Sequence, residues 1–61
     1  MFNVYFFGSL AVTVDVASGA ILAVTDRVSG LAASLRYSPA YIAQARSYAH
    51  QAWASTADAT L

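Results

Sequence analysis

The fold is decided by residues 9–25, which read SLAVTVDVASGAILAVT. Over residues 10–16 apolar side chains alternate with small or polar ones, which is the period-two pattern of a half-buried strand. The apolar side chains on one side of this strand are those of Leu10, Val12, Val14 and Val16. A helix would scatter these four positions around its circumference, because its side chains repeat every 3.6 residues. The pattern therefore predicts a β-strand.

A turn between Asp15 and Gly19 predicts that the chain then reverses into a second strand. The aspartate side chain can bond the backbone two residues further on, and the glycine stands where a left-handed conformation closes a type I turn with a bulge. The second strand covers residues 20–25 and completes a β-hairpin. The expected cross-strand pairs are Val14 with Ile21, Val12 with Ala23, Thr13 with Leu22, and Ala11 with Val24. Both faces of this hairpin are largely apolar.

The N-terminal residues 1–7 form an aromatic cluster of Phe2, Tyr5, Phe6 and Phe7. One interpretation is a third strand, kinked from the next by Gly8, whose side chains fill the core. The other is an arm that inserts into a neighbouring protein, since extended aromatic segments add readily to an open sheet edge.

Two helices are predicted after the hairpin. A short one covers residues 27–35, with Asp26 as its N-cap, although Gly30 weakens it by about 1 kcal/mol relative to alanine. A longer one runs from Pro39 to about Ser55. Ser38 suits its N-cap, and proline suits the first helical position, where its missing N–H is no loss.

The longer helix is amphipathic. Ile42, Ala49 and Trp53 align on one stripe, which is broadened by Tyr41, Ala45, Tyr48 and Ala52. This stripe is expected to pack on one face of the ribbon, because a sheet face and a helix stripe must bury each other. The predicted fold is α+β in a single domain, residues 1–61. It has a hairpin region with an aromatic N-terminal arm at 1–25, a helical region at 26–55 and a flexible tail at 56–61.

Residues 4–25 also permit a second interpretation, a single membrane span. The segment contains no Lys or Arg and has about the length that crosses a bilayer. However, Asp15 lies near its centre, where a carboxylate costs roughly 2.5–3.5 kcal/mol.

The composition limits the functions that this chain can have. Only three basic and three acidic residues occur among 61, the formal net charge is zero, and 59% of the residues are hydrophobic. A domain of this size buries only about 60% of the surface that its unfolded chain exposes, so some of the remaining apolar surface must face something other than water. Three isolated arginines do not supply the clustered charge that direct nucleic-acid binding needs.

The residues that carry chemistry are few. The chain has no cysteine, so disulfides and thiolate metal sites are excluded, and its one histidine, His50, cannot form a zinc site with so few carboxylates. No glycine-rich loop offers an oxyanion hole or a phosphate cradle. We therefore expect no enzymatic activity, no cofactor and no metal.

These observations predict a non-enzymatic structural subunit of a large multi-protein assembly. Other protein subunits, in a homo- or hetero-oligomer, are its expected partners, and a minor component of a virus or phage particle is the expected setting. The alternative is a single-span accessory subunit of a membrane complex, with its span at about 4–25. Asp15 and Gly19 are predicted as structural turn residues. The predicted partner interface comprises Phe2, Tyr5, Phe6, Phe7, Leu22, Val24, Tyr41, Tyr48 and Trp53.

Overall fold

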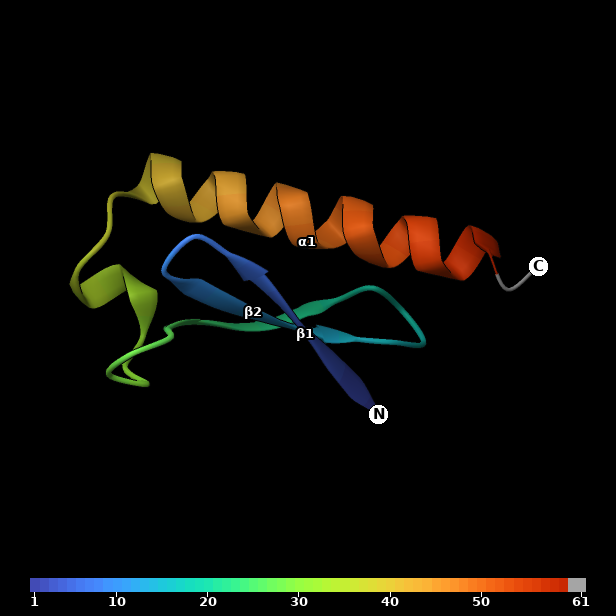
Figure 1. The fold of residues 1–61 in the computed structure, drawn as a ribbon, viewed down its shortest axis with the longest axis horizontal. Helices are drawn as coiled ribbons and strands as arrows, with labels where there is room; N and C mark the ends of the chain where they lie inside the picture. The colour runs from blue at the N-terminus through green and yellow to red at the C-terminus, as the bar shows by residue number, and fades with distance from the viewer. Residues whose placement is uncertain (60–61) are drawn as a thin grey trace.

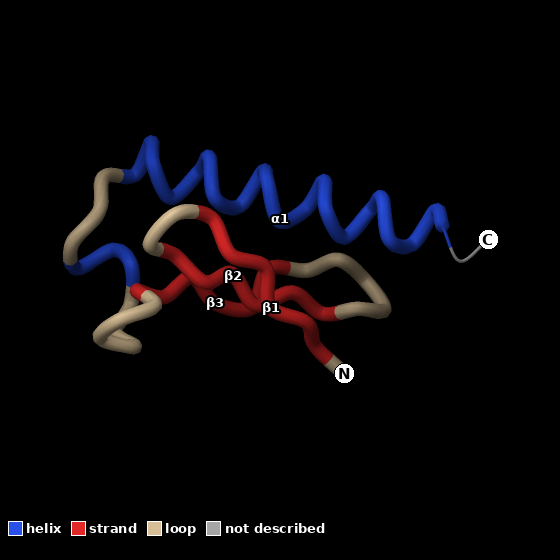
Figure 2. The backbone as a smooth tube through the Cα atoms, viewed as in Figure 1, coloured by secondary structure: helices blue, strands red, loops and turns tan. Residues whose placement is uncertain are grey.

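A three-stranded antiparallel sheet lies beneath one long helix in the computed structural model, which describes residues 1–59 (Figures 1 and 2). The sheet order is β1-β2-β3. The elements are β1 (Phe2–Phe7), β2 (Leu10–Asp15), β3 (Ile21–Asp26), the 3-10 helix η1 (Ala33–Leu35) and α1 (Pro39–Ala59). The predicted α+β fold, with a hairpin, a short helical element and a longer helix, is confirmed.

The aromatic N-terminus is the third strand of the chain's own sheet. β1 pairs antiparallel with β2, from Phe2 opposite Asp15 to Phe7 opposite Leu10. Gly8 begins the two-residue connection with a φ of 55°, as the first central residue of a type II′ hairpin turn requires. A side chain at Gly8 would also collide with the hydroxyl of Tyr41.

Residues 4–25 lie in the strands and their connections, so the alternative prediction of a helical membrane span over this segment is wrong. Among residues 1–59, no helix has the length and apolar character needed to cross a membrane.

The register of the second hairpin contains a bulge that the sequence pattern does not predict. Val14 pairs with Ile21 as expected, but Thr13 pairs with Ala23 and Val12 with Val24, because Leu22 is an extra residue in β3. Leu22 and Ala23 together oppose one residue of β2, which is the definition of a bulge. The predicted pairs beyond Ile21 are therefore wrong by one residue. As a result, Val24 lies on the helix-covered face of the sheet.

The predicted turn residues stand where β2 ends and in its connection to β3. The backbone N–H of Gly19 donates to the Asp15 carbonyl at 2.7 Å, and Gly19 has a φ of 78°. The Asp15 carboxylate accepts a hydrogen bond from the Ser18 hydroxyl at 2.6 Å. The indole N–H of Trp53, on α1, donates to the carbonyl of Val16 at 2.7 Å, which ties this turn to the helix.

The predicted helix over residues 27–35 is only the single 3-10 turn η1. Asp26 does accept the backbone N–H groups of Val28 and Ser29, as an N-cap would. However, Gly30 has a φ of 76°, and Ala32 then forms an isolated bridge with Thr25. The left-handed residue stops the helix, and the chain turns back along β3 instead.

The core lies between α1 and β2. Its buried members are Leu10, Val12 and Val14 of β2, Ala33 of η1, and Ala45 and Ala49 of α1. Alanine at these helix positions lets the helix backbone approach the sheet closely, and the larger Ile42 and Trp53 pack around them.

The ends of α1 differ in how well they were predicted. Ser38 caps its start, because the Ser38 side chain accepts the N–H of Tyr41 at 3.2 Å. At the other end the helix continues through Ala59, past the predicted end near Ser55 and into the predicted tail. Residues 60 and 61 of that tail lie outside the described residues.

Candidate protein-interaction surface

The face of the sheet that points away from α1 is apolar and exposed. Side chains alternate across a strand, so the residues of β2 that do not enter the core point to this side, together with their neighbours on β1 and β3. Phe2 is 64% exposed, Phe6 54% and Leu22 58%. We call this surface the open face; it comprises Phe2, Val4, Phe6, Ala11, Thr13, Leu22, Ala23 and Thr25.

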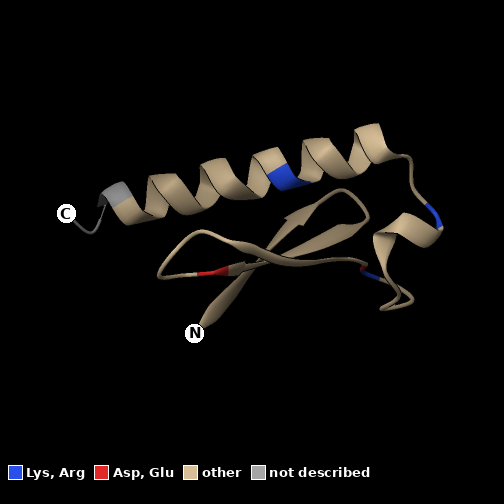
Figure 3. Ribbon diagram, turned by 180° about the vertical axis from the view of Figure 1, so that it is seen from behind, with Lys and Arg blue, Asp and Glu red and all other residues tan. Residues whose placement is uncertain are grey.

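Charge is confined to the ends of the open face (Figure 3). At one end, Asp15 stands opposite Phe2, and the Ser18 hydroxyl bonded to the carboxylate is the largest cause that lowers the pKa of Asp15. At the other end, the Arg27 guanidinium lies 4.1 Å from the centre of the Phe6 ring and donates to the Gly8 carbonyl at 3.3 Å. The middle of the face carries only apolar groups and threonines.

Apart from Tyr48, the structure divides the predicted partner-interface residues into two sets. Phe2, Phe6 and Leu22 lie together on the open face, whereas Tyr48 lies half exposed on α1. The remaining ones pack against this chain's own core: Tyr5, Phe7, Val24, Tyr41 and Trp53. Val24 joins this second set because the bulge turns it toward the helix.

The aromatic side chains on the helix-covered side form their own cluster. The ring of Phe7 lies 5.5 Å from that of Tyr41 and 5.5 Å from that of Tyr48, and Tyr37 stacks on Tyr41 at the same separation. Tilted and offset pairs at such distances stabilise packing beyond simple burial. This cluster fixes the start of α1 on the hairpin of β1 and β2, so its role is structural.

Asp26 is a buried polar centre that the sequence pattern identified only as a cap. It is 4% exposed, and its carboxylate accepts hydrogen bonds from the Tyr37 hydroxyl at 2.7 Å and from the N–H groups of Val28 and Ser29. These bonds lower the pKa of Asp26, the Tyr37 hydroxyl being the largest cause. The same carboxylate raises the pKa of the Tyr37 hydroxyl. The arrangement anchors the loop after β3 to the segment before α1.

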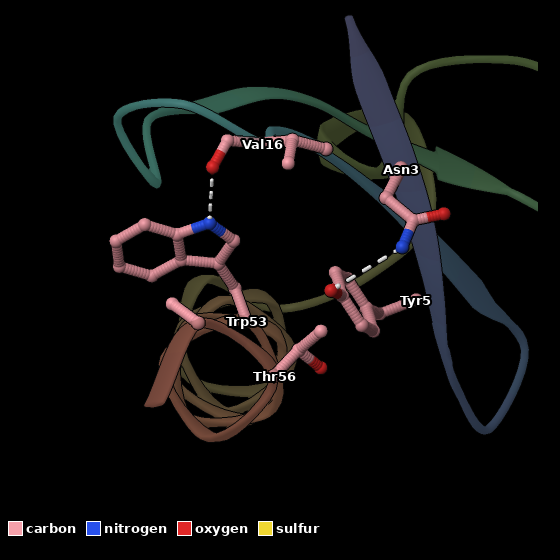
Figure 4. A pocket seen from close by; sticks show the side chains of 6 residues that line it. Asn3, Tyr5, Val16, Trp53 and Thr56 are labelled. Carbon is pink, nitrogen blue, oxygen red and sulfur yellow. Dashed lines mark hydrogen bonds between the residues drawn. The ribbon is translucent and has the colours of Figure 1, made fainter. Parts of the chain in front are cut away.

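A shallow pocket of about 150 Å³ lies between β1 and the C-terminal half of α1 (Figure 4). Asn3 and Tyr5 line it from the strand, Trp53 and Thr56 from the helix. The Asn3 amide approaches the Tyr5 hydroxyl at 3.4 Å. Pockets that bind drug-sized molecules usually hold about 300–1,000 Å³, and this one lies below that range.

Among the side chains of residues 1–57, no three of the His, Asp, Glu or Cys type gather where they could hold a metal ion. His50 lies on the exposed side of α1 with its ring 5.5 Å from that of Trp53. Comparison with the models of known protein families, with curated protein sequences and with solved structures finds no match. The open face is therefore the feature of this chain from which a function is best argued.

The sequence did carry a signal for the open face. Two apolar sides on one hairpin indicate that one helix cannot cover both, and α1 indeed covers one. The sequence pattern did not identify Val4 as part of the open face. The Val4 side chain lies between those of Phe2 and Phe6 on the same side of β1. The sequence pattern also missed the bond from Tyr37 to Asp26, because the two residues lie in different segments that only the fold brings together.

Proposed function

We propose that this chain is a non-enzymatic structural subunit of a multi-protein assembly, in which its open face packs against a neighbouring protein. The observation that carries the proposal is the exposure of Phe2, Phe6 and Leu22 on one side of a sheet whose other side is covered by α1. The prediction that the assembly is a virus or phage particle stays a prediction.

The physical argument is the layer rule. A domain is built from layers that bury one another's apolar faces, and a sheet with two apolar faces needs a layer on each. Burying an aromatic side chain removes roughly 150–250 Å² from water, at about 25 cal/mol per Å² of apolar area. The partner's side chains would thus act as the missing third layer.

The composition of the open face also fits a protein partner. The buried centres of protein interfaces are depleted in charged residues and enriched in aromatic ones. The open face has phenylalanines on β1 and charges only at its ends, Asp15 and Arg27. Those charges would lie at the rim, where interfaces are polar.

The test compares two substitutions in the native complex, purified through a tag on this chain. Leu22→Asp places a carboxylate in the open face, and we expect it to abolish copurification of the neighbouring protein. Leu35→Asp is the matched control, because Leu35 is 68% exposed but lies on η1, outside the open face. We expect this variant to retain the neighbour.

Labelling with a carbene reagent provides the second measurement. Phe2, Phe6 and Leu22 should be labelled in the isolated chain and protected in the complex, whereas Leu35 should be labelled in both. Equal labelling of the open face in the two states, or purification of the wild-type chain as a free monomer from its native source, would contradict the proposal.

A further inference from the structure

We propose that the free edge of β1 pairs antiparallel with β1 of a second copy of this chain, about a two-fold axis at Val4. This pairing would join two three-stranded sheets into one continuous sheet. The inference goes beyond the proposed function, because it concerns the backbone at the edge of the sheet and names the occupant.

The backbone of β1 has its free donors and acceptors at known positions. Val16 donates its N–H to the carbonyl of Met1 at 3.1 Å, in line with the register that pairs β1 with β2. Along an antiparallel pair, hydrogen-bonded and non-hydrogen-bonded positions alternate. The odd-numbered residues of β1 therefore bond to β2, and the N–H and C=O groups of Phe2, Val4 and Phe6 point out of the sheet.

The two edges of the sheet differ in their protection. Natural sheets protect their edges with charges, prolines, bulges or covering loops. The outer edge of β3 has a bulge at Leu22 and Ala23, and the loop that follows folds back to bridge Thr25 to Ala32. β1 has the sequence FNVYFF, with no charge and no proline, and its register with β2 has no shift. Within residues 1–59, no other strand covers its outer side.

The edge of β1 is complementary to itself. A two-fold axis at Val4 places Val4 opposite its own copy and Phe2 opposite Phe6 of the second copy. In this register all the outward N–H and C=O groups meet as hydrogen-bonded pairs. The phenylalanines meet on the same side of the joined sheet, where cross-strand aromatic pairs are stabilising. β1 carries no charge that the axis would place beside its like (Figure 3).

The separation between α1 and β1 is uneven along the strand. In Figure 1 the N-terminal end of β1 runs away from α1, and the pocket lined by Asn3 and Tyr5 opens between them. The proposed register places Asn3 opposite Tyr5 of the second copy, so polar groups would meet polar groups on that side.

The test measures the oligomeric state of the purified chain by sedimentation velocity over a range of concentrations. We expect the wild type to form a dimer. Val4→Pro removes an outward N–H that the β1–β2 ladder does not use, and proline is tolerated at such edge positions. It should raise the dimer Kd about tenfold or more, because both symmetric bonds at Val4 are lost. Val4→Thr keeps the N–H and the branched shape, and should still dimerise.

Charge substitutions test the register and keep the backbone intact. Val4→Lys and Val4→Glu each place two like charges opposite one another across the axis, so each variant alone should be monomeric. An equimolar mixture should form the heterodimer. Far-ultraviolet circular dichroism shows which variants are folded. If Val4→Pro does not fold, the mixture of the two charge variants still tests the β1–β1 pairing.

Three outcomes would overturn the inference: a monomeric wild type at every concentration, a dimer that Val4→Pro leaves unchanged, or a mixture of the charge variants that stays monomeric. Leu22→Asp separates this inference from the proposed function, because Leu22 lies on β3, across the sheet from the free edge. That variant should lose the neighbouring protein but keep the β1 dimer. A dimer lost with Leu22→Asp and kept with Val4→Pro would assign self-association to the open face instead.

Discussion

Gly19 lies directly beneath the indole ring of Trp53. Its φ of 78° favours glycine, and a Cβ added there would lie 2.6 Å from the ring. Gly30 has nearly the same backbone conformation, with a φ of 76°, but a Cβ there would meet nothing within 4 Å. The two positions thus separate the cost of the backbone conformation from the cost of the contact.

We expect Gly30→Ala to lower the free energy of unfolding by about 1 kcal/mol, which is the cost of a left-handed alanine. Gly19→Ala should lower it by a further 1–3 kcal/mol or so, because the ring must move. Urea unfolding measures both, and the fluorescence of Trp53, the single tryptophan, reports the ring's displacement in the second variant only. Equal losses in the two variants would show that the packing against Trp53 contributes nothing.

The bond between Tyr37 and Asp26 makes stability depend on pH at both extremes. The pKa of Asp26 is below its ordinary 3.8, so its contribution is present above about pH 4 and is lost as the pH falls through the lowered pKa. The pKa of Tyr37 is above its ordinary 10.0, so its contribution is present below pH 10 and is lost as the pH rises through the raised value. Asp15, whose pKa is also lowered, adds to the acid loss alone.

Tyr37→Phe keeps the ring on Tyr41 and removes the hydroxyl. We expect it to lower stability at neutral pH. We also expect stability to decrease less than in the wild type as the pH is moved from neutral to acid or to alkaline values. Urea midpoints measured from pH 2 to 11 test this. Asp15→Asn is the control. It should reduce the loss of stability at acid pH and leave the loss of stability at alkaline pH unchanged. Parallel profiles for Tyr37→Phe and the wild type would show that this bond does not couple stability to pH.

At the scale of the element, the bulge in β3 decides which side chains face the helix. Without Leu22 as an extra residue, Ala23 would oppose Val12 and Val24 would turn to the open face. With it, Val24 packs against the core and Asp26 reaches the position opposite Leu10, from which it meets Tyr37. The bulge therefore leaves Leu22 exposed, partly buries Val24 and buries Asp26.

Deletion of Leu22 should be tolerated, because Thr13 then pairs with Ala23 in a regular ladder and every later pair is kept. We expect the free energy of unfolding to change by less than about 1 kcal/mol. Deletion of Val24 is the matched control. It removes a residue that packs against the core and should cost roughly 1.5–3 kcal/mol. Thermal and urea unfolding of both variants measure the difference; a Leu22 deletion as harmful as the Val24 deletion would refute this account of the bulge.

At the scale of the whole molecule, one helix covers one side of a sheet that is apolar on both. The formal net charge is zero at pH 7, so electrostatic repulsion adds little to keep copies apart. The open face is thus the surface through which the isolated chain should associate without specificity at high concentration.

The double variant Phe2→Thr and Leu22→Thr should raise the solubility of the isolated chain near neutral pH. Its free energy of unfolding should stay within about 1 kcal/mol of the wild type, because both side chains are more than half exposed. Val28→Thr with Leu35→Thr is the control, since these residues are at least as exposed but lie off the sheet. A solubility gain as large in the control would mean that total apolar exposure matters, and not the open face.

The sequence by itself determined the order of elements in this protein. Alternating β-branched residues, glycines at the chain reversals and the Ser38-Pro39 start of the long helix are local signals, because each acts through the few residues around it. The apolar side chains on both sides of the hairpin also indicated that the helix would leave one side uncovered.

Only the tertiary structure decided the bulge at Leu22, the end of the predicted short helix at η1, and which aromatic side chains stay exposed. Each of these depends on contacts between residues far apart in the chain: Trp53 with Val16, Tyr37 with Asp26, Ala32 with Thr25. A one-residue shift in register turns every later side chain to the other face, and packing against α1 selects among such registers. Local sequence patterns do not contain that choice, because the competing registers have the same turn and the same alternation.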